Sequence, residues 1–95
     1  MAVYMVVNLD VKDPSAYEKY KAEVPALIRK HGGEYLARGG SCRVFEGDWR
    51  PNRLVLTRFP DRESVEAFFN DPEYQPLKEL RHRVAKSDIV VVEGL

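Results

Sequence analysis

One arginine near the end of the sequence has the clearest chemical potential. Arg81 follows Leu77 by four positions and precedes Val84 by three, so in a helix it shares their apolar face. A guanidinium group on such a face needs a carboxylate, a carbonyl group or a bound anion as its partner. Two interpretations stay open: an internal ion pair, for instance with a glutamate of the sheet, or an anchor for an anionic ligand. Arg38 could point into the same cleft.

Three further side chains could move or hold a proton. Tyr20 and Tyr74 fall on helix faces that are expected to point inward, and buried phenols need hydrogen-bond partners. His31 ends the first expected helix on its apolar stripe, where it could shuttle protons or simply cap the last carbonyl groups. We therefore take His31, Tyr20 and Tyr74 as candidate catalytic residues, and Arg81 and Arg38 as candidate substrate-binding residues. Each of them could instead belong to the core.

Other kinds of site find little support. The single cysteine, Cys42, and the absence of histidines and carboxylates at ligand spacing argue against a metal site. Gly39 and Gly40 precede a strand-like run and not a helix, so they do not form a phosphate-binding loop. We expect neither a metal nor a cofactor.

The composition bounds the class of protein. The 95 residues correspond to one domain, residues 1–95. A formal net charge of zero argues against a nucleic-acid-binding protein, and no apolar run approaches the roughly 20 residues of a membrane span. One cysteine and no signal-like N-terminus favour the cytoplasm.

Hydrophobic periodicity predicts the elements that must position these side chains. Strands are expected at Ala2–Leu9, at Glu34–Arg38 continuing with a bend through Arg43–Gly47, at Arg53–Phe59 and at Ile89–Val92. Helices are expected from Asp13-Pro14 to Gly32-Gly33, from Asp61 to Asn70, and from about Glu73 or Pro76 to Val84. The order predicts an α+β, ferredoxin-like β-α-β-β-α-β domain, with an antiparallel sheet and helices on one face.

The strands are apolar on both faces, which predicts a homodimer. Val3, Met5 and Val7 alternate with Tyr4 and Val6, and all five are apolar or aromatic. Helices can cover only one face of the sheet, so the other face would be a large exposed apolar patch. A second copy related by a two-fold axis is the simplest cover.

Several segments together resemble the uncharacterised bacterial family called domain of unknown function 1330, within the dimeric α/β-barrel superfamily. The resemblance covers almost the whole chain and lies in residues 31–40, 45–49, 53–60 and 71–75, in Arg81, and in the closing residues 91–94. It implies a ferredoxin-like homodimer whose sheets meet in a barrel, with any pocket between sheet and helices. It supplies no activity. Thr57-Arg58 departs from the family pattern, which has an apolar residue followed by glutamate, so a pairing of that glutamate with Arg81 is not carried over.

Three hypotheses for function follow. The first is a cofactor-independent enzyme that acts on a small anionic or enolisable substrate held by Arg81 and Arg38. The second is a ligand-binding or stress-related module that uses the same pocket without turnover. The third is a structural dimer whose arginines form ion pairs.

Overall fold

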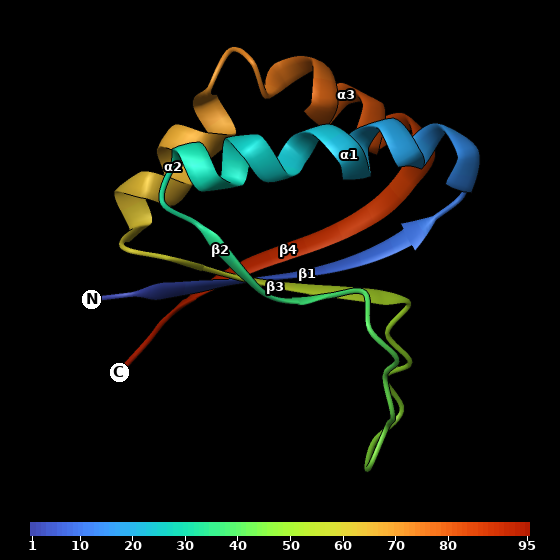
Figure 1. Ribbon diagram of the computed structural model, residues 1–95. Coiled ribbons are helices and arrows are strands. Elements are labelled where there is room, and N and C mark those ends of the chain that lie inside the picture. Colours follow the sequence, from blue (N-terminus) through green and yellow to red (C-terminus); the bar gives the residue numbers. More distant parts are fainter.

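The chain folds around one four-stranded antiparallel sheet (Figure 1). The computed structural model describes residues 1–95. In chain order the elements are β1 (Val3–Val11), α1 (Pro14–Lys30), β2 (Glu34–Arg38), β3 (Arg53–Phe59), α2 (Arg62–Asn70), α3 (Gln75–Val84) and β4 (Ala85–Glu93). The strand order is β2-β3-β1-β4. The predicted α+β, ferredoxin-like arrangement is confirmed, with the second helical segment divided into α2 and α3.

Two aspartates begin the helices as the sequence predicts. The Asp13 side chain accepts a hydrogen bond from the backbone N–H of Ala16, at 3.1 Å, and Pro14 occupies the first turn of α1. Asp61 accepts hydrogen bonds from both the backbone N–H and the hydroxyl group of Ser64. These bonds favour the carboxylate and hold the pKa of Asp61 below its usual value.

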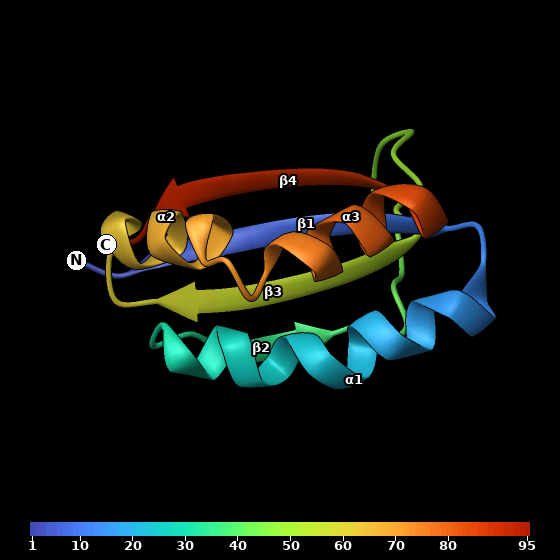
Figure 2. The same ribbon diagram turned by 90° about the horizontal axis from the view of Figure 1, so that it is seen from above.

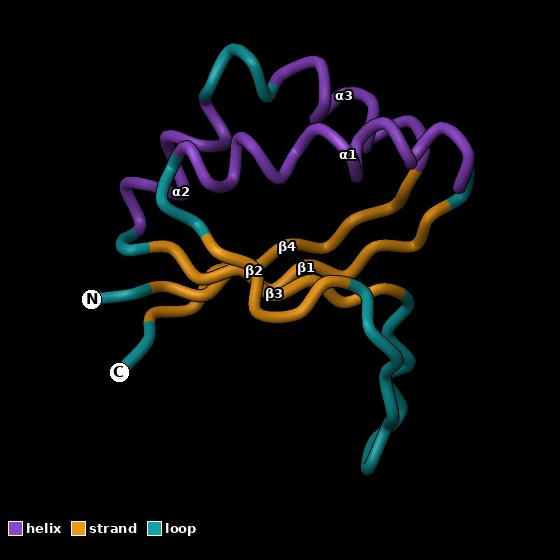
Figure 3. Tube along the Cα trace, in the orientation of Figure 1, coloured by secondary structure: helices purple, strands orange, loops and turns teal.

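The helices cover one face of the sheet and leave the other open (Figures 1 and 2). Residues of the strands alternate accordingly: Met5 and Val7 of β1 are buried toward the helices, while Tyr4 and Val6 point to the open face. The loop of residues 39–52 extends away from the sheet on the open side (Figure 3). Within one chain the sheet does not close into a barrel.

The predicted continuation of the second strand through Arg43–Gly47 is wrong. The strand ends at Arg38, and residues 41–50 are all exposed and lie outside any strand. Since Arg38 is opposite Val55, continuing the ladder would place residue 42 opposite Pro51, which has no backbone N–H to donate. The irregularity in β2 lies at Leu36, within the strand, and not between Arg38 and Arg43 where the bend was expected.

The last strand is longer than predicted and begins without a loop. β4 starts at Ala85, directly after Val84 ends α3, and pairs with β1 over its whole length. The first half of β4 is polar, so the sequence pattern predicted only the apolar run Ile89–Val92 as a strand.

Candidate functional site

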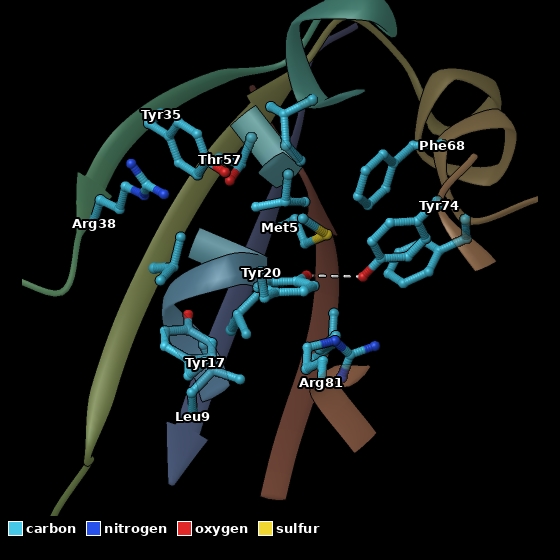
Figure 4. A pocket seen from close by; sticks show the side chains of 16 residues that line it. Met5, Leu9, Tyr17, Tyr20, Tyr35, Arg38, Thr57, Phe68, Tyr74 and Arg81 are labelled. Carbon is cyan, nitrogen blue, oxygen red and sulfur yellow. Dashed lines mark hydrogen bonds between the residues drawn. The ribbon is translucent and has the colours of Figure 1, made fainter. Parts of the chain in front are cut away.

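A small cavity lies between the sheet and the helices (Figure 4). Its volume is about 40 Å³, room for roughly three water molecules. Thirteen of the 16 lining residues are hydrophobic. The sequence-predicted residues that line it are Tyr20, Arg38, Tyr74 and Arg81. A mainly apolar lining with a few convergent polar groups is typical of small-molecule sites, although the volume is well below the roughly 300–1,000 Å³ of most ligand pockets.

Arg81 is a buried cation without a protein counter-ion. Its side chain comes from the inner face of α3, and the residue is only 4% exposed. None of the ion pairs in the structure includes Arg81, and its buried Nε–H has no hydrogen-bond acceptor. The predicted alternative of an ion pair with a sheet glutamate is therefore absent. A buried guanidinium group without a counter-ion is costly to maintain, because its charge is removed from water without compensation.

Thr57 is a second unsatisfied polar group in the lining. The residue is completely buried on the helix side of β3, and its hydroxyl group has no hydrogen-bond partner. Arg58, the next residue, is exposed and pairs in register with Tyr4 of the open face. A glutamate at position 58 would therefore lie on the opposite side of the sheet from Arg81.

The hydroxyl groups of Tyr20 and Tyr74 lie 2.9 Å apart and form one hydrogen bond across the cavity wall. Tyr20 comes from α1, and Tyr74 precedes the first turn of α3. Burial raises the pKa of the Tyr20 phenol far above its ordinary value, and Tyr74 adds to the shift. Tyr20 consequently stays protonated and can serve as a hydrogen-bond donor, but not as a base near neutral pH.

Arg38 marks the mouth of the cavity. It is the only exposed residue in the lining, so the cavity reaches the surface beside it. Its guanidinium group donates a hydrogen bond to the carbonyl oxygen of Lys21 and lies over the Tyr35 ring, 5.0 Å from the centroid. Burial also raises the pKa of the Tyr35 phenol, against the opposing charge of Arg38.

His31 lies apart from the cavity and is engaged elsewhere. Its Nε2 atom is 2.8 Å from Oδ2 of Asp71, and its ring meets the edge of Phe68. Asp71 also accepts hydrogen bonds from Lys30 Nζ, at 2.8 Å, and from the backbone N–H of Glu73. The hydrogen bond from Lys30, followed by that from His31, holds the pKa of Asp71 well below its usual range. The cluster ties the end of α1 to the segment between α2 and α3.

Sequence reasoning missed two residues of this region, Thr57 and Asp71. Thr57 did give a signal, because a hydroxyl group at the inward position of an apolar strand is unusual. Asp71 gave no signal beyond its place before Pro72, just after the expected end of the second helix. Its partners Lys30 and His31 lie 41 and 40 positions away in the chain.

The structure contains neither a metal-ligand cluster nor a helix suited to a membrane. No group of three or more histidine, cysteine, aspartate or glutamate side chains could hold a metal ion. None of the helices has the length and apolarity required to traverse a bilayer.

Fold and cavity together define a ferredoxin-like α+β domain with a pocket between helices and sheet. The chain belongs to the family described as domain of unknown function (DUF1330), whose model matches residues 2–95. The resemblance that was inferred from the sequence is thereby confirmed. Comparison with curated protein sequences gave no match.

Solved structures with this fold differ widely in sequence. A protein of unknown function from Rhodopseudomonas palustris, RPA0582, aligns with a TM-score of 0.80 at 17% identity, over 99% of this chain and 82% of that one. A dimeric ferredoxin-like protein of unknown function from Jannaschia aligns at 0.73 and 16% identity, over 99% and 100%. SnoaB, a cofactor-independent oxygenase from Streptomyces nogalater, aligns at 0.70 and 16% identity, over 99% and 93%. At these identities the likeness shows a shared fold.

Proposed function

We propose that this protein binds a small molecule in the cavity beside Arg81 through an anionic group of that molecule. The observation that carries the proposal is the buried guanidinium group, which has a cavity next to it and no counter-ion from the chain. A carboxylate or enolate oxygen would supply the missing charge, while the apolar walls would exclude water. Tyr20 and Tyr74 can add a hydrogen bond to the same oxygen.

Binding without turnover is the form of this function that the geometry favours. No carboxylate or histidine lines the cavity, and the Tyr20 phenol is a poor base. The cavity thus lacks a group that could accept a proton near neutral pH.

Binding can be measured by thermal unfolding in the presence of monocarboxylates from acetate to hexanoate. A true ligand raises the melting temperature as its concentration increases. The Arg81→Met variant keeps an apolar side chain of similar length and should lose the shift. Arg83, exposed on the same helix, provides the matched control Arg83→Met, which should retain it. The proposal fails if no monocarboxylate stabilises the protein, or if both variants respond alike.

A second candidate is an enzyme acting on a substrate that enolises readily. It is supported by the protonated Tyr20–Tyr74 pair beside Arg81, which could stabilise an enolate oxygen while a water molecule that enters with the substrate accepts the carbon-bound proton. SnoaB shows that this fold can host chemistry without a cofactor. Exchange of carbon-bound hydrogen of a 1,3-diketone in D2O, followed by NMR, tests it. Exchange no faster than in buffer would leave only the binding function.

We also propose that the protein works as a homodimer through the open face of the sheet. Val90 and Val92 of β4 are 63% and 56% exposed there, although valines are ordinarily buried. They adjoin Val6 and Tyr4 of β1 in register and so form a continuous apolar surface. The Jannaschia protein with this fold is described as dimeric. Two such sheets packed face to face would cover both surfaces.

A further inference from the structure

We infer that Arg38 and Arg53 form a second anion-binding subsite at the mouth of the cavity. The ligand is accordingly a small dicarboxylate, or another molecule with two anionic ends, whose inner charge meets Arg81. This inference rests on the proposed binding function and specifies its ligand class.

The strand register places the two arginines together. Arg38 of β2 lies opposite Val55 of β3, and Arg53 precedes Val55 by two positions on the same strand. Arg53 is also opposite Leu9, which is buried under the helices. Both arginine side chains therefore emerge on the helix side as diagonal neighbours, typically about 7–8 Å apart at the backbone. One carboxylate can bridge long side chains across that distance.

The first helix holds both guanidinium groups beside the cavity. Arg38 donates to the carbonyl oxygen of Lys21, and the Arg53 guanidinium carbon lies 5.8 Å from the centroid of the Tyr17 ring. Tyr17 and Lys21 are one turn apart on α1. Tyr17 and Arg38 both line the cavity, so Arg53 lies beside its wall through the contact with Tyr17.

A glycine leaves the space that Arg53 fills. A Cβ atom at Gly39 would lie 2.1 Å from Nη1 of Arg53, and the φ angle of Gly39 is +73°. The guanidinium group is thus packed against the end of β2 and is not free in solvent. Its Nε–H is buried without an acceptor, as is that of Arg81.

The charges around the opening are not compensated. Fifteen acidic residues balance fifteen basic ones over the whole chain, yet no carboxylate pairs with Arg38, Arg53 or Arg81. Two neighbouring guanidinium groups repel each other unless an anion lies between them. Their planar donor arrays are well suited to a carboxylate.

A paired ligand series tests the inference. Dissociation constants are measured by calorimetry or NMR for dicarboxylates from malonate to adipate, and for monocarboxylates of the same carbon number at equal ionic strength. At least one dicarboxylate should bind about tenfold more tightly than its monocarboxylate counterpart, because it gains charge-assisted hydrogen bonds. Arg53→Met and Arg38→Met should each weaken dicarboxylate binding more than monocarboxylate binding, and so reduce that advantage. Arg50→Met, at an exposed loop arginine, is the control.

The outcomes separate this inference from the proposed function. If monocarboxylates bind through Arg81 but dicarboxylates bind no better, the outer subsite is wrong and the inner one stands. The subsite is also wrong if dicarboxylates bind better but neither Arg38→Met nor Arg53→Met reduces the advantage. If no carboxylate of either series binds, both proposals are overturned. Arg38 is exposed, so Arg38→Met should fold. The test therefore remains decisive even if Arg53→Met fails to fold.

Discussion

Tyr20 and Tyr74 share one hydrogen bond at 2.9 Å, although 54 positions separate them in the chain. Their rings are both buried, and the Tyr74 ring also packs on Phe68 with the centroids 4.2 Å apart. The bond joins α1 to the start of α3, the helix that carries Arg81. It therefore fixes the relative position of the two helices that enclose the cavity.

Removing one of the two hydroxyl groups should cost more than half as much unfolding free energy as removing both. Tyr20→Phe or Tyr74→Phe leaves the other phenol buried without its partner, at a cost of about 1–3 kcal/mol in the free energy of unfolding. The double variant removes both polar groups, so its cost should be clearly smaller than the sum of the single costs. Urea unfolding at one fixed protein concentration measures the wild type, the two single variants and the double variant. Strictly additive costs would show that the hydroxyl groups do not interact.

The alkaline limb of the stability curve should depend on Tyr20. Since burial raises the folded-state pKa of this phenol, the folded protein retains a proton that the unfolded chain loses above its ordinary pKa of about 10. Stability from Tyr20 is thus complete below that pH and declines as the pH rises above it. Tyr20→Phe should have a shallower alkaline decline in denaturant midpoint than the wild type. Equal slopes would contradict the predicted state of the phenol.

Asp71 should contribute to stability at neutral pH and lose its effect in acid. Its folded-state pKa is lowered by hydrogen bonds from Lys30 and His31, so its contribution is present above the ordinary aspartate pKa of about 3.9 and is lost as the pH falls below it. Asp71→Asn should unfold at lower denaturant concentration than the wild type at pH 7. The difference between the two denaturant midpoints should be smaller at pH 3. Asp10→Asn, which breaks only the exposed pair with Lys12, should change little at either pH. A midpoint difference that does not change with pH would contradict the lowered pKa of Asp71.

A charge on the open face should dissociate the proposed dimer. Val90→Lys places an ammonium group at the centre of the apolar surface, where a facing sheet would have to desolvate it. Light scattering should give the mass of a dimer for the wild type and of a monomer for this variant. Glu66→Lys, on the exposed face of α2, should remain dimeric. A monomeric wild type over a wide concentration range would remove the basis for the dimer.

The sequence predicted the features that depend on local spacing. Helical periodicity placed Arg81 and Tyr20 on buried faces, and alternation showed that β1 is apolar on both sides. It misjudged features that depend on partners distant in the chain. His31 shares the apolar stripe of α1, but Asp71, 40 positions away, holds it outside the cavity. Residues 43–47 look like a strand, but residues 41–50 are all exposed and lie outside any strand. The cavity itself arises from packing and has no local pattern.

The direct passage from Val84 of α3 to Ala85 of β4 limits how this chain can vary in length. Successive strand residues point to opposite faces, so one residue inserted at this junction would exchange the two sides of β4. Val90 and Val92 would then turn toward the helices, and Ile89 would turn to the open face. One junction thus sets both the register of the open face and the position of the helix that carries Arg81. Insertions during evolution or engineering should be tolerated in residues 40–51, and deletions or insertions at this joint should not.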